Sequence, residues 1–496
     1  MTGTKNIWKH GYLHYLIALV IGILIALFLK PTATEEVEGL THLGVRLIAI
    51  VVPTLYLWLV ANTHWTSLLF LGALVASQVL GDNPNTVWAG ALGHFAVIMV
   101  TTFFLLDYAL NETGVADKAV IWLITRKFTR GRPYAFLTMF FFTNIFVGVF
   151  MQNLALAVMF LGLAVNVCEK VGVKKGDKLY TCLMLGSMWG NNILGIASPI
   201  AKNLPLIMMG LVYSATDGAV RITFAQWLAA GIPFSLVMFG VLMVCIRIMN
   251  PDVSPLKNID FDELEASSPP LGLRGKIALA ALLVLVLFIL MPDLLILLAP
   301  AGSGLYNMAS YLVKVTIAVP AIITVAALCI IHVDGKPVME FTEAIKRVPV
   351  TLLIFMAAVV VLPIGSPAVG IVPWIRNGLE PLVAGMSPMA VVFMLVAGIL
   401  FLTNVASNIV VMTLFFNIGF ALLWGGTMSI AAVSIIIAFS VSLMACLTPS
   451  ASLTTPLYYG PGHITVKNSA KWNLIFIVLS FVTMLVFIPF LALIVG

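Results

Sequence analysis

The sequence predicts an all-α protein that crosses a membrane many times. Of its 496 residues, 61% are hydrophobic and only 9% are charged, and the mean hydropathy is +1.11; soluble domains do not have this composition. Apolar runs recur along the whole chain, and about 20 such residues cross a bilayer as one helix. Backbone in lipid must satisfy its own hydrogen bonds, so these runs are expected to be helices. We predict eleven transmembrane helices and two re-entrant hairpins.

In the first half, the run at residues 12–29 follows a basic start but lacks a small-residue cleavage site. We interpret it as a retained span rather than a signal peptide. An apolar block at 134–167 is too long for one crossing and too short for two crossings with a turn, which favours a hairpin with its tip near mid-bilayer. The other expected spans of this half are 43–62, 65–81, 88–110, a span broken near 195–203, and 226–249.

A polar connection rich in acidic residues, with a Ser-Ser-Pro-Pro run, follows at 251–272 and is typical of a solvated linker. In the second half, the block 386–422 raises the same length problem as the first block and is predicted to be a second hairpin. The other expected spans are 274–297, 306–331, 348–371, a span broken near 446–456, and 472–495.

Charge asymmetry sets the orientation, because Lys and Arg near span ends favour the cytoplasm. With the N-terminus inside, most of the 26 basic residues fall in inner loops. The basic flanks of the first block, 118–132 and 170–178, lie on one side only if that block is a hairpin that opens to the cytoplasm. The second hairpin then opens outward, and the two halves form an inverted repeat. The net charge of +6 is thus explained by basic residues in the inner loops, and it does not indicate binding to nucleic acid. The expected partner is the lipid bilayer.

The predicted organisation therefore has four parts. They are a first transmembrane helix and loop (1–41), repeat 1 (42–250) with the cytoplasm-facing hairpin 134–167, a cytoplasmic linker (251–272), and repeat 2 (273–496) with the outward-facing hairpin 386–422.

Two short matches support the repeat. QNLALAVMF from Gln152 resembles SNIVVMTLF from Ser407, which aligns Asn153 with Asn408. LGIASPIA, ending at residue 201, resembles MACLTPSA, ending at residue 451. The second match aligns Ser198 with Thr448 and Pro199 with Pro449.

Each half thus has an asparagine at a hairpin tip and a hydroxyl-Pro pair at a break in a span. A break at proline frees backbone N–H groups, and a half-helix N-terminus carries roughly half a positive charge, so the breaks are candidate anion sites. The expected donors to an oxyanion are Asn153, Asn408, Ser198 and Thr448; tip carbonyl groups with Thr403 and Ser407 could hold a hard cation. The alternative is that these polar residues only join helices to one another.

Two charged residues also fall in apolar segments. Lys202 follows the first break at apparent mid-depth, where an ammonium group is costly unless functional or paired. We interpret it as facing the anion or replacing a coupling ion. Asp107 lies near a predicted inner helix end, and we interpret it as a cap or as the partner of a loop cation.

At these residues the chain resembles the divalent anion/sodium symporter family of di- and tricarboxylate carriers, over nearly its full length. The family's tips carry Ser-Asn-Thr, and here they read Gln152-Asn153-Leu154 and Ser407-Asn408-Ile409. The family's Ser/Thr-Pro-Pro-type turn corresponds to the two hydroxyl-Pro breaks. The resemblance implies a substrate site of Asn153, Asn408, Ser198, Pro199, Thr448, Pro449, Gln152 and Ser407, to which we add Lys202.

The resemblance also implies cation sites and an assembly. One possible sodium site corresponds to Thr403, Ala406 and Asn408. The other corresponds to Gly148 and Gln152, where serines are expected. The family further implies a homodimer in which each subunit has a scaffold domain and a transport domain that moves as an elevator.

We therefore expect a secondary active carrier of small dicarboxylates such as malate, succinate, fumarate and 2-oxoglutarate, in the plasma membrane with a cytoplasmic N-terminus. Exchange is favoured, because a glutamine amide and a fixed lysine charge could take the place of sodium. The alternatives are a sodium-coupled dicarboxylate or citrate symporter and an anion channel. An enzyme is not expected, because the sequence has neither HExxH nor GxSxG nor paired intramembrane carboxylates.

Overall fold

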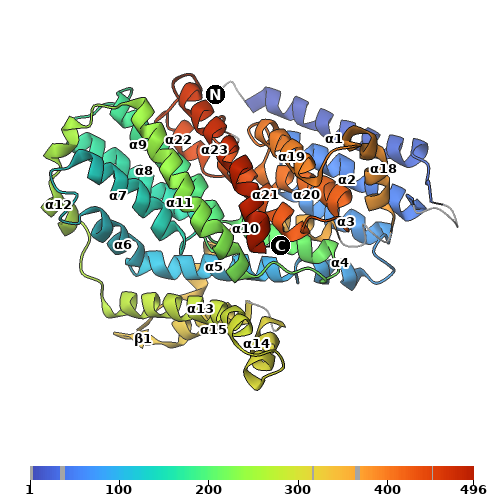
Figure 1. Cartoon of the computed structure of the whole chain (residues 1–496), viewed down its shortest axis with the longest axis horizontal. Coiled ribbons are helices and arrows are strands. Elements are labelled where there is room, and N and C mark those ends of the chain that lie inside the picture. Colours follow the sequence, from blue (N-terminus) through green and yellow to red (C-terminus); the bar gives the residue numbers. More distant parts are fainter. Residues whose placement is uncertain (1–3, 34–38, 315–317, 364–368, 450, 496) are drawn as a thin grey trace.

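The structure is a computed structural model that describes every residue except 1–3, 34–38, 315–317, 364–368, 450 and 496 (Figure 1). It is an all-helical, multi-pass membrane fold with one very short strand pair. The helices of the first half are α1 Thr4–Phe28, α2 His42–Val60, α3 Trp65–Ser77, α4 Pro84–Ala91, α5 Phe95–Glu112, α6 Val115–Ile124, α7 Pro133–Gly148, α8 Asn153–Lys170, α9 Lys178–Ala197, α10 Asn203–Ala215 and α11 Phe224–Met249.

The linker and the second half contain the remaining elements. They are η1 Ser254–Asn258, α12 Phe261–Ala266, α13 Leu273–Leu298, α14 Gly304–Lys314, α15 Ala318–Ile330, β1 His332–Val333, β2 Lys336–Pro337, α16 Phe341–Lys346, α17 Val350–Val361, α18 Ile371–Val383, α19 Pro388–Leu402, α20 Asn408–Leu423, α21 Ile430–Met444, α22 Thr455–Tyr459 and α23 Val466–Val495.

Within the described residues, six helices are long and apolar enough to cross a membrane, or up to eight if two bent helix pairs each count as one span. Eleven spans therefore stays a prediction. The difference arises because several expected spans are broken: the run predicted at 306–331 consists of α14 and α15, bent by 76°. In the described part of the run predicted at 348–371, α17 has 12 residues, which are fewer than one straight crossing needs.

Both long apolar blocks are divided into two helices near their centres. α7 ends at Gly148 and α8 begins at Asn153, whereas α19 ends at Leu402 and α20 begins at Asn408. The two halves also make corresponding contacts: α7, α8 and α11 pack on α9, and α19, α20 and α23 pack on α21. The re-entrant topology of both blocks and the inverted repeat stay predictions.

The core lies where α9 and α21 contact each other. All residues of α21 are buried, as expected for a helix that is apolar on every side. α7 approaches α9 closely because Gly186 has no side chain; a Cβ atom there would collide with the ring of Phe141. The centre of the molecule is thus formed by the two helices that lead into the predicted breaks.

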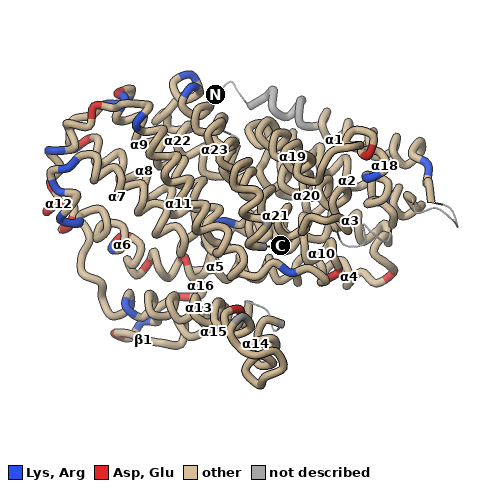
Figure 2. Tube along the Cα trace, in the orientation of Figure 1, with Lys and Arg blue, Asp and Glu red and all other residues tan. Residues whose placement is uncertain are grey.

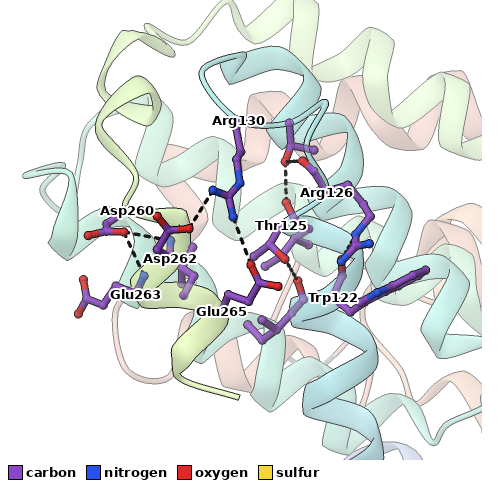
Figure 3. A network of polar contacts seen from close by, with 12 residues as sticks. Trp122, Thr125, Arg126, Arg130, Asp260, Asp262, Glu263 and Glu265 are labelled. Atoms are coloured by element: carbon purple, nitrogen blue, oxygen red, sulfur yellow. Dashed lines mark hydrogen bonds and ion pairs between the residues drawn. The ribbon is translucent and has the colours of Figure 1, made fainter. Parts of the chain in front are cut away.

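The linker is more ordered than its composition suggests, and it contacts residues on both sides of the first block; Figure 3 shows the contacts of Arg130, on the α7 side. Arg130, just before α7, contacts Asp262 at 2.8 Å and Glu265 at 3.2 Å. Lys170, at the end of α8, contacts Glu263 at 2.7 Å. Exposed ion pairs each contribute only about 0–1 kcal/mol. The attachment of the linker to the ends of α7 and α8 therefore depends on several pairs acting together. Figure 2 shows that Lys and Arg gather around this end of the molecule, near α12 and the start of α9.

Two short features differ from the predicted all-α chain of spans. β1 pairs with β2 in antiparallel register, because Asp334 and Gly335 between them adopt φ values of 52° and 77°, the conformation that Asp-Gly turns favour. In addition, α6 occupies residues that we expected to form a loop. Its 10 residues connect α5 to the basic stretch before α7.

Candidate functional site

A cavity of about 430 Å³ lies between the two predicted tips and a second wall of the protein. The tip side is lined by Asn153, Leu154, Lys202, Asn203, Leu204, Ser407, Asn408, Ile409, Ser452 and Leu453; the opposite wall is lined by Asn62, Thr63, His64, Phe104, Pro349, Thr351, Leu352 and Phe355. Four of the predicted site residues, Asn153, Asn408, Ser407 and Lys202, therefore meet at one cavity although they come from three separate parts of the chain.

Three helices begin at this cavity. Their N-cap residues are Gln152 for α8, Lys202 for α10 and Ser407 for α20, and none of these side chains makes a capping hydrogen bond. First-turn N–H groups have no partner within their own helix, and the helix dipole favours negative charge there. Three converging N-termini make this wall of the cavity suited to anions such as carboxylates.

The first tip is fastened to the first break. Gln152 Nε2 donates to Ile200 O at 2.8 Å, and the backbone N–H of Asn153 donates to Ala201 O at 2.8 Å. The N–H of Ile200 in turn donates to Ser198 Oγ at 3.1 Å. Ser198 thus supports the turn of the break, and neither it nor Pro199 nor Gln152 lines the cavity.

Asp107 belongs to the same arrangement. Its Oδ1 accepts the backbone N–H of Gln152 at 3.2 Å, and the residue is only 9% exposed. The interpretation of Asp107 as a cap or as the partner of a loop cation is wrong, because it contacts the tip instead. The four ion pairs of the described residues do not include it.

The second tip is fastened to the second break through Asn404. Its Oδ1 accepts the N–H groups of Cys446 at 3.2 Å and Leu447 at 2.9 Å. The hydroxyl of Thr448 donates to Asn404 O at 2.5 Å. Thr448 thus joins tip to break, and neither it nor Pro449 lines the cavity. Asn404 is a supporting residue, although the sequence placed it among the polar residues of a tip predicted to bind a ligand.

The possible cation site brings oxygen atoms together. The hydroxyl of Thr403 donates to Asn408 Oδ1 at 3.0 Å, and Thr403, Ala406 and Asn408 are all buried. Hydroxyl and amide oxygens are among the ligands that hard cations use, so the chemistry of Thr403 and Asn408 is compatible with a sodium ion. No group of three or more His, Cys, Asp or Glu side chains that could hold a metal occurs in the described part of the chain.

Lys202 connects the first half of the chain to the second half. Its Nζ donates to Ser442 Oγ at 3.0 Å, and Ser442 donates to Asn192 O at 3.0 Å. Gly195 leaves room for the lysine stem, because a Cβ atom there would collide with that stem and lie 2.8 Å from Ser442 Oγ. Among the described residues, no carboxylate forms an ion pair with Lys202. Its charge is therefore available to an anion in the adjoining cavity.

Sequence reasoning missed Asn203 and the opposite wall. Asn203 begins α10, lines the cavity and is 5% exposed. Its place beside the break is visible in the sequence, but a single asparagine in an apolar segment is equally consistent with helix packing. The wall around Asn62 and His64 comes from the turn between α2 and α3, and no local signal connects that turn to the tips.

Comparisons with known proteins identify transporters. A family model described as "Citrate transporter" matches residues 53–442. A sodium-dependent dicarboxylate transporter, SdcS of Staphylococcus saprophyticus, is 24% identical over 498 aligned residues, covering 96% of this chain and 91% of that protein.

Two solved structures share the fold. The YdaH transporter of Alcanivorax borkumensis has a TM-score of 0.56 at 12% identity and covers 97% of this chain and 98% of its own. MtrF of Neisseria gonorrhoeae, described as one of a class of antimetabolite efflux pumps, has a TM-score of 0.54 at 12% identity and covers 96% and 94%.

Proposed function

Because the chain belongs to the citrate transporter family, we propose that this membrane transporter is a secondary active carrier of small dicarboxylates such as malate, succinate, fumarate and 2-oxoglutarate. The observation that carries the proposal is the cavity between the tips, where α8, α10 and α20 begin. Asn153, at the first tip, and Asn408, at the second tip, both line this cavity. Each could hold one carboxylate of a short diacid, with the backbone N–H groups of its helix as further donors.

Transport proceeds by exchange of one dicarboxylate for another. In support, the Gln152 amide donates to Ile200 O, at the tip where the resembled family has a cation site. Lys202 lines the cavity and, when protonated, adds a positive charge there. An empty substrate site with this charge would move across the bilayer poorly, since an uncompensated charge in a membrane is costly. A bound dianion offsets the charge.

Sodium symport of a dicarboxylate or of citrate is the second candidate. It is supported by the contact between Thr403 and Asn408, two of the three residues of the possible sodium site with Ala406, and by the relative that is named sodium-dependent. In both candidates the chain acts as a homodimer in the plasma membrane with its N-terminus in the cytoplasm, and the substrate site is carried by an elevator movement of one domain.

Uptake of labelled dicarboxylate into proteoliposomes tests the proposal. Exchange requires unlabelled dicarboxylate inside the vesicles and is indifferent to sodium. Uptake driven by an inward sodium gradient into vesicles without internal dicarboxylate contradicts exchange and supports symport. Flux of the anion down its own gradient, with no counter-substrate and no sodium, indicates a channel.

A further inference from the structure

The two repeats contribute unequally to the cavity. The alignment of the tips pairs Asn153 with Asn408 and Leu154 with Ile409; extending the alignment of the breaks pairs Lys202 with Ser452 and Asn203 with Leu453. All eight residues line the cavity. The tip pairs are alike, whereas the pairs after the breaks differ. One end of the cavity thus has an additional amide where the other end has an apolar side chain.

The amide oxygen of Asn203 is buried without a partner among the described residues. The residue is 5% exposed, and among the described residues its Oδ1 has no hydrogen-bond partner. A buried amide group left unpaired is destabilising, and in natural structures such groups call for an explanation. At the edge of a binding cavity, a group on the ligand is the direct explanation.

We propose that Asn203 binds the hydroxyl group of the substrate, so that the carrier selects 2-hydroxy dicarboxylates over dicarboxylates without a substituent. The inference rests on the proposed function, because it assumes that carboxylates bind at Asn153 and Asn408. The N–H of Asn153 donates to Ala201 O, which places the first tip within two residues of Asn203 along the break. A hydroxyl on the carbon next to the carboxylate at Asn153 then comes beside the Asn203 amide.

A hydroxyl group suits this position because it both donates and accepts, so it can pair with either atom of the amide. Succinate has only methylene groups there, and its binding would leave the amide unpaired. A site built to bond a hydroxyl discriminates against the analogue that lacks it, since the polar group of the site loses its partner. At the other end of the cavity, Leu453 offers no such partner. Selection therefore depends on one end of the substrate.

The test is competition in proteoliposomes that contain the full-length protein and exchange labelled fumarate. Inhibition constants for malate and succinate are measured for each variant. The wild-type protein is expected to bind malate about tenfold more tightly than succinate. Asn203→Leu, which copies the residue at the corresponding position of the second repeat, and Asn203→Ala should both bring the ratio close to one. The control is Asn417→Leu, because Asn417 donates to Thr413 O within α20 and does not line the cavity; its ratio should equal that of the wild type.

Thermal stabilisation of the purified variants by succinate checks that they are folded and bind a dicarboxylate. A wild-type protein that exchanges malate and succinate with equal affinity overturns the inference alone, as does a preference that survives in both Asn203 variants. A wild-type protein that exchanges no dicarboxylate overturns the proposed function together with the inference.

Discussion

Replacing Lys202 by methionine should weaken dicarboxylate binding by roughly a hundredfold and leave the protein folded. Methionine retains most of the apolar stem that passes Gly195 but removes the ammonium group. The folded state then loses one hydrogen bond of a charged group, from Nζ to Ser442 Oγ, which contributes about 1.5–3 kcal/mol. The hydroxyl of Ser442 keeps its bond to Asn192 O, so no buried group is left unpaired by the change.

The magnitude follows from Coulomb's law. A unit charge about 6 Å from one substrate carboxylate, at an effective dielectric constant of about 20, contributes about 3 kcal/mol. Because about 1.4 kcal/mol corresponds to a factor of ten, this is roughly a hundredfold in affinity. The four ion pairs of the described residues do not involve Lys202, so no neighbouring carboxylate cancels its effect on the substrate.

The assay is the concentration of external malate that gives half-maximal exchange, at equal amounts of reconstituted protein. Lys118→Met is the matched control, because Lys118 donates to Ser268 O in the linker, away from the cavity. That variant should exchange like the wild type. A half-maximal concentration for Lys202→Met within about threefold of the wild type would refute the electrostatic role. If sodium restores exchange in Lys202→Met, the ammonium group acts in place of an ion.

Three further predictions concern the tips and the topology. Asn153→Ala and Asn408→Ala should each abolish transport with normal expression; near-normal uptake by either variant would remove that residue from the site. Cysteines at positions 128 and 174 should both react with an impermeant reagent from the cytoplasmic side, and labelling from opposite faces would mean that the first block spans the membrane. Asn404→Ala should lower the free energy of unfolding by about 2–6 kcal/mol, because two backbone N–H groups lose their acceptor at about 1–3 kcal/mol each; a thermal melt like that of the wild type would contradict this.

Some parts of the fold could be predicted because they depend on length and local sequence. Comparing the length of an apolar block with the thickness of a bilayer needs no tertiary information, and the two blocks are in fact divided near Gly148 and Leu402. The first break could be found from Ser198 and Pro199, and α9 ends at Ala197. Span counting failed at α17, which ends at Val361 directly before Leu362 and Pro363; the expected span ran past a proline that disfavours helix in the residue before it.

The site could be predicted in part for the same reason. Asn153 and Asn408 were recognisable because each repeats in an equivalent segment, and both line the cavity. The sequence could not separate donors to a ligand from donors to the protein's own backbone. Ser198 and Thr448 looked like ligand donors, yet their hydroxyl groups make bonds within the breaks and to Asn404. That distinction depends on the direction of each side chain.

The hydrogen bond from Gln152 to Ile200 O has a consequence for how far the carrier could concentrate its substrate. A dissociable ion at that position would bring the energy of its own gradient, about 1.4 kcal/mol for each tenfold difference in concentration. An amide that is part of the chain returns with the protein in every cycle and brings no gradient energy. Under exchange, the accumulation ratio of one dicarboxylate could then never exceed the ratio set by its counter-substrate. The cell's supply of that counter-substrate, rather than its ion pumps, would limit uptake.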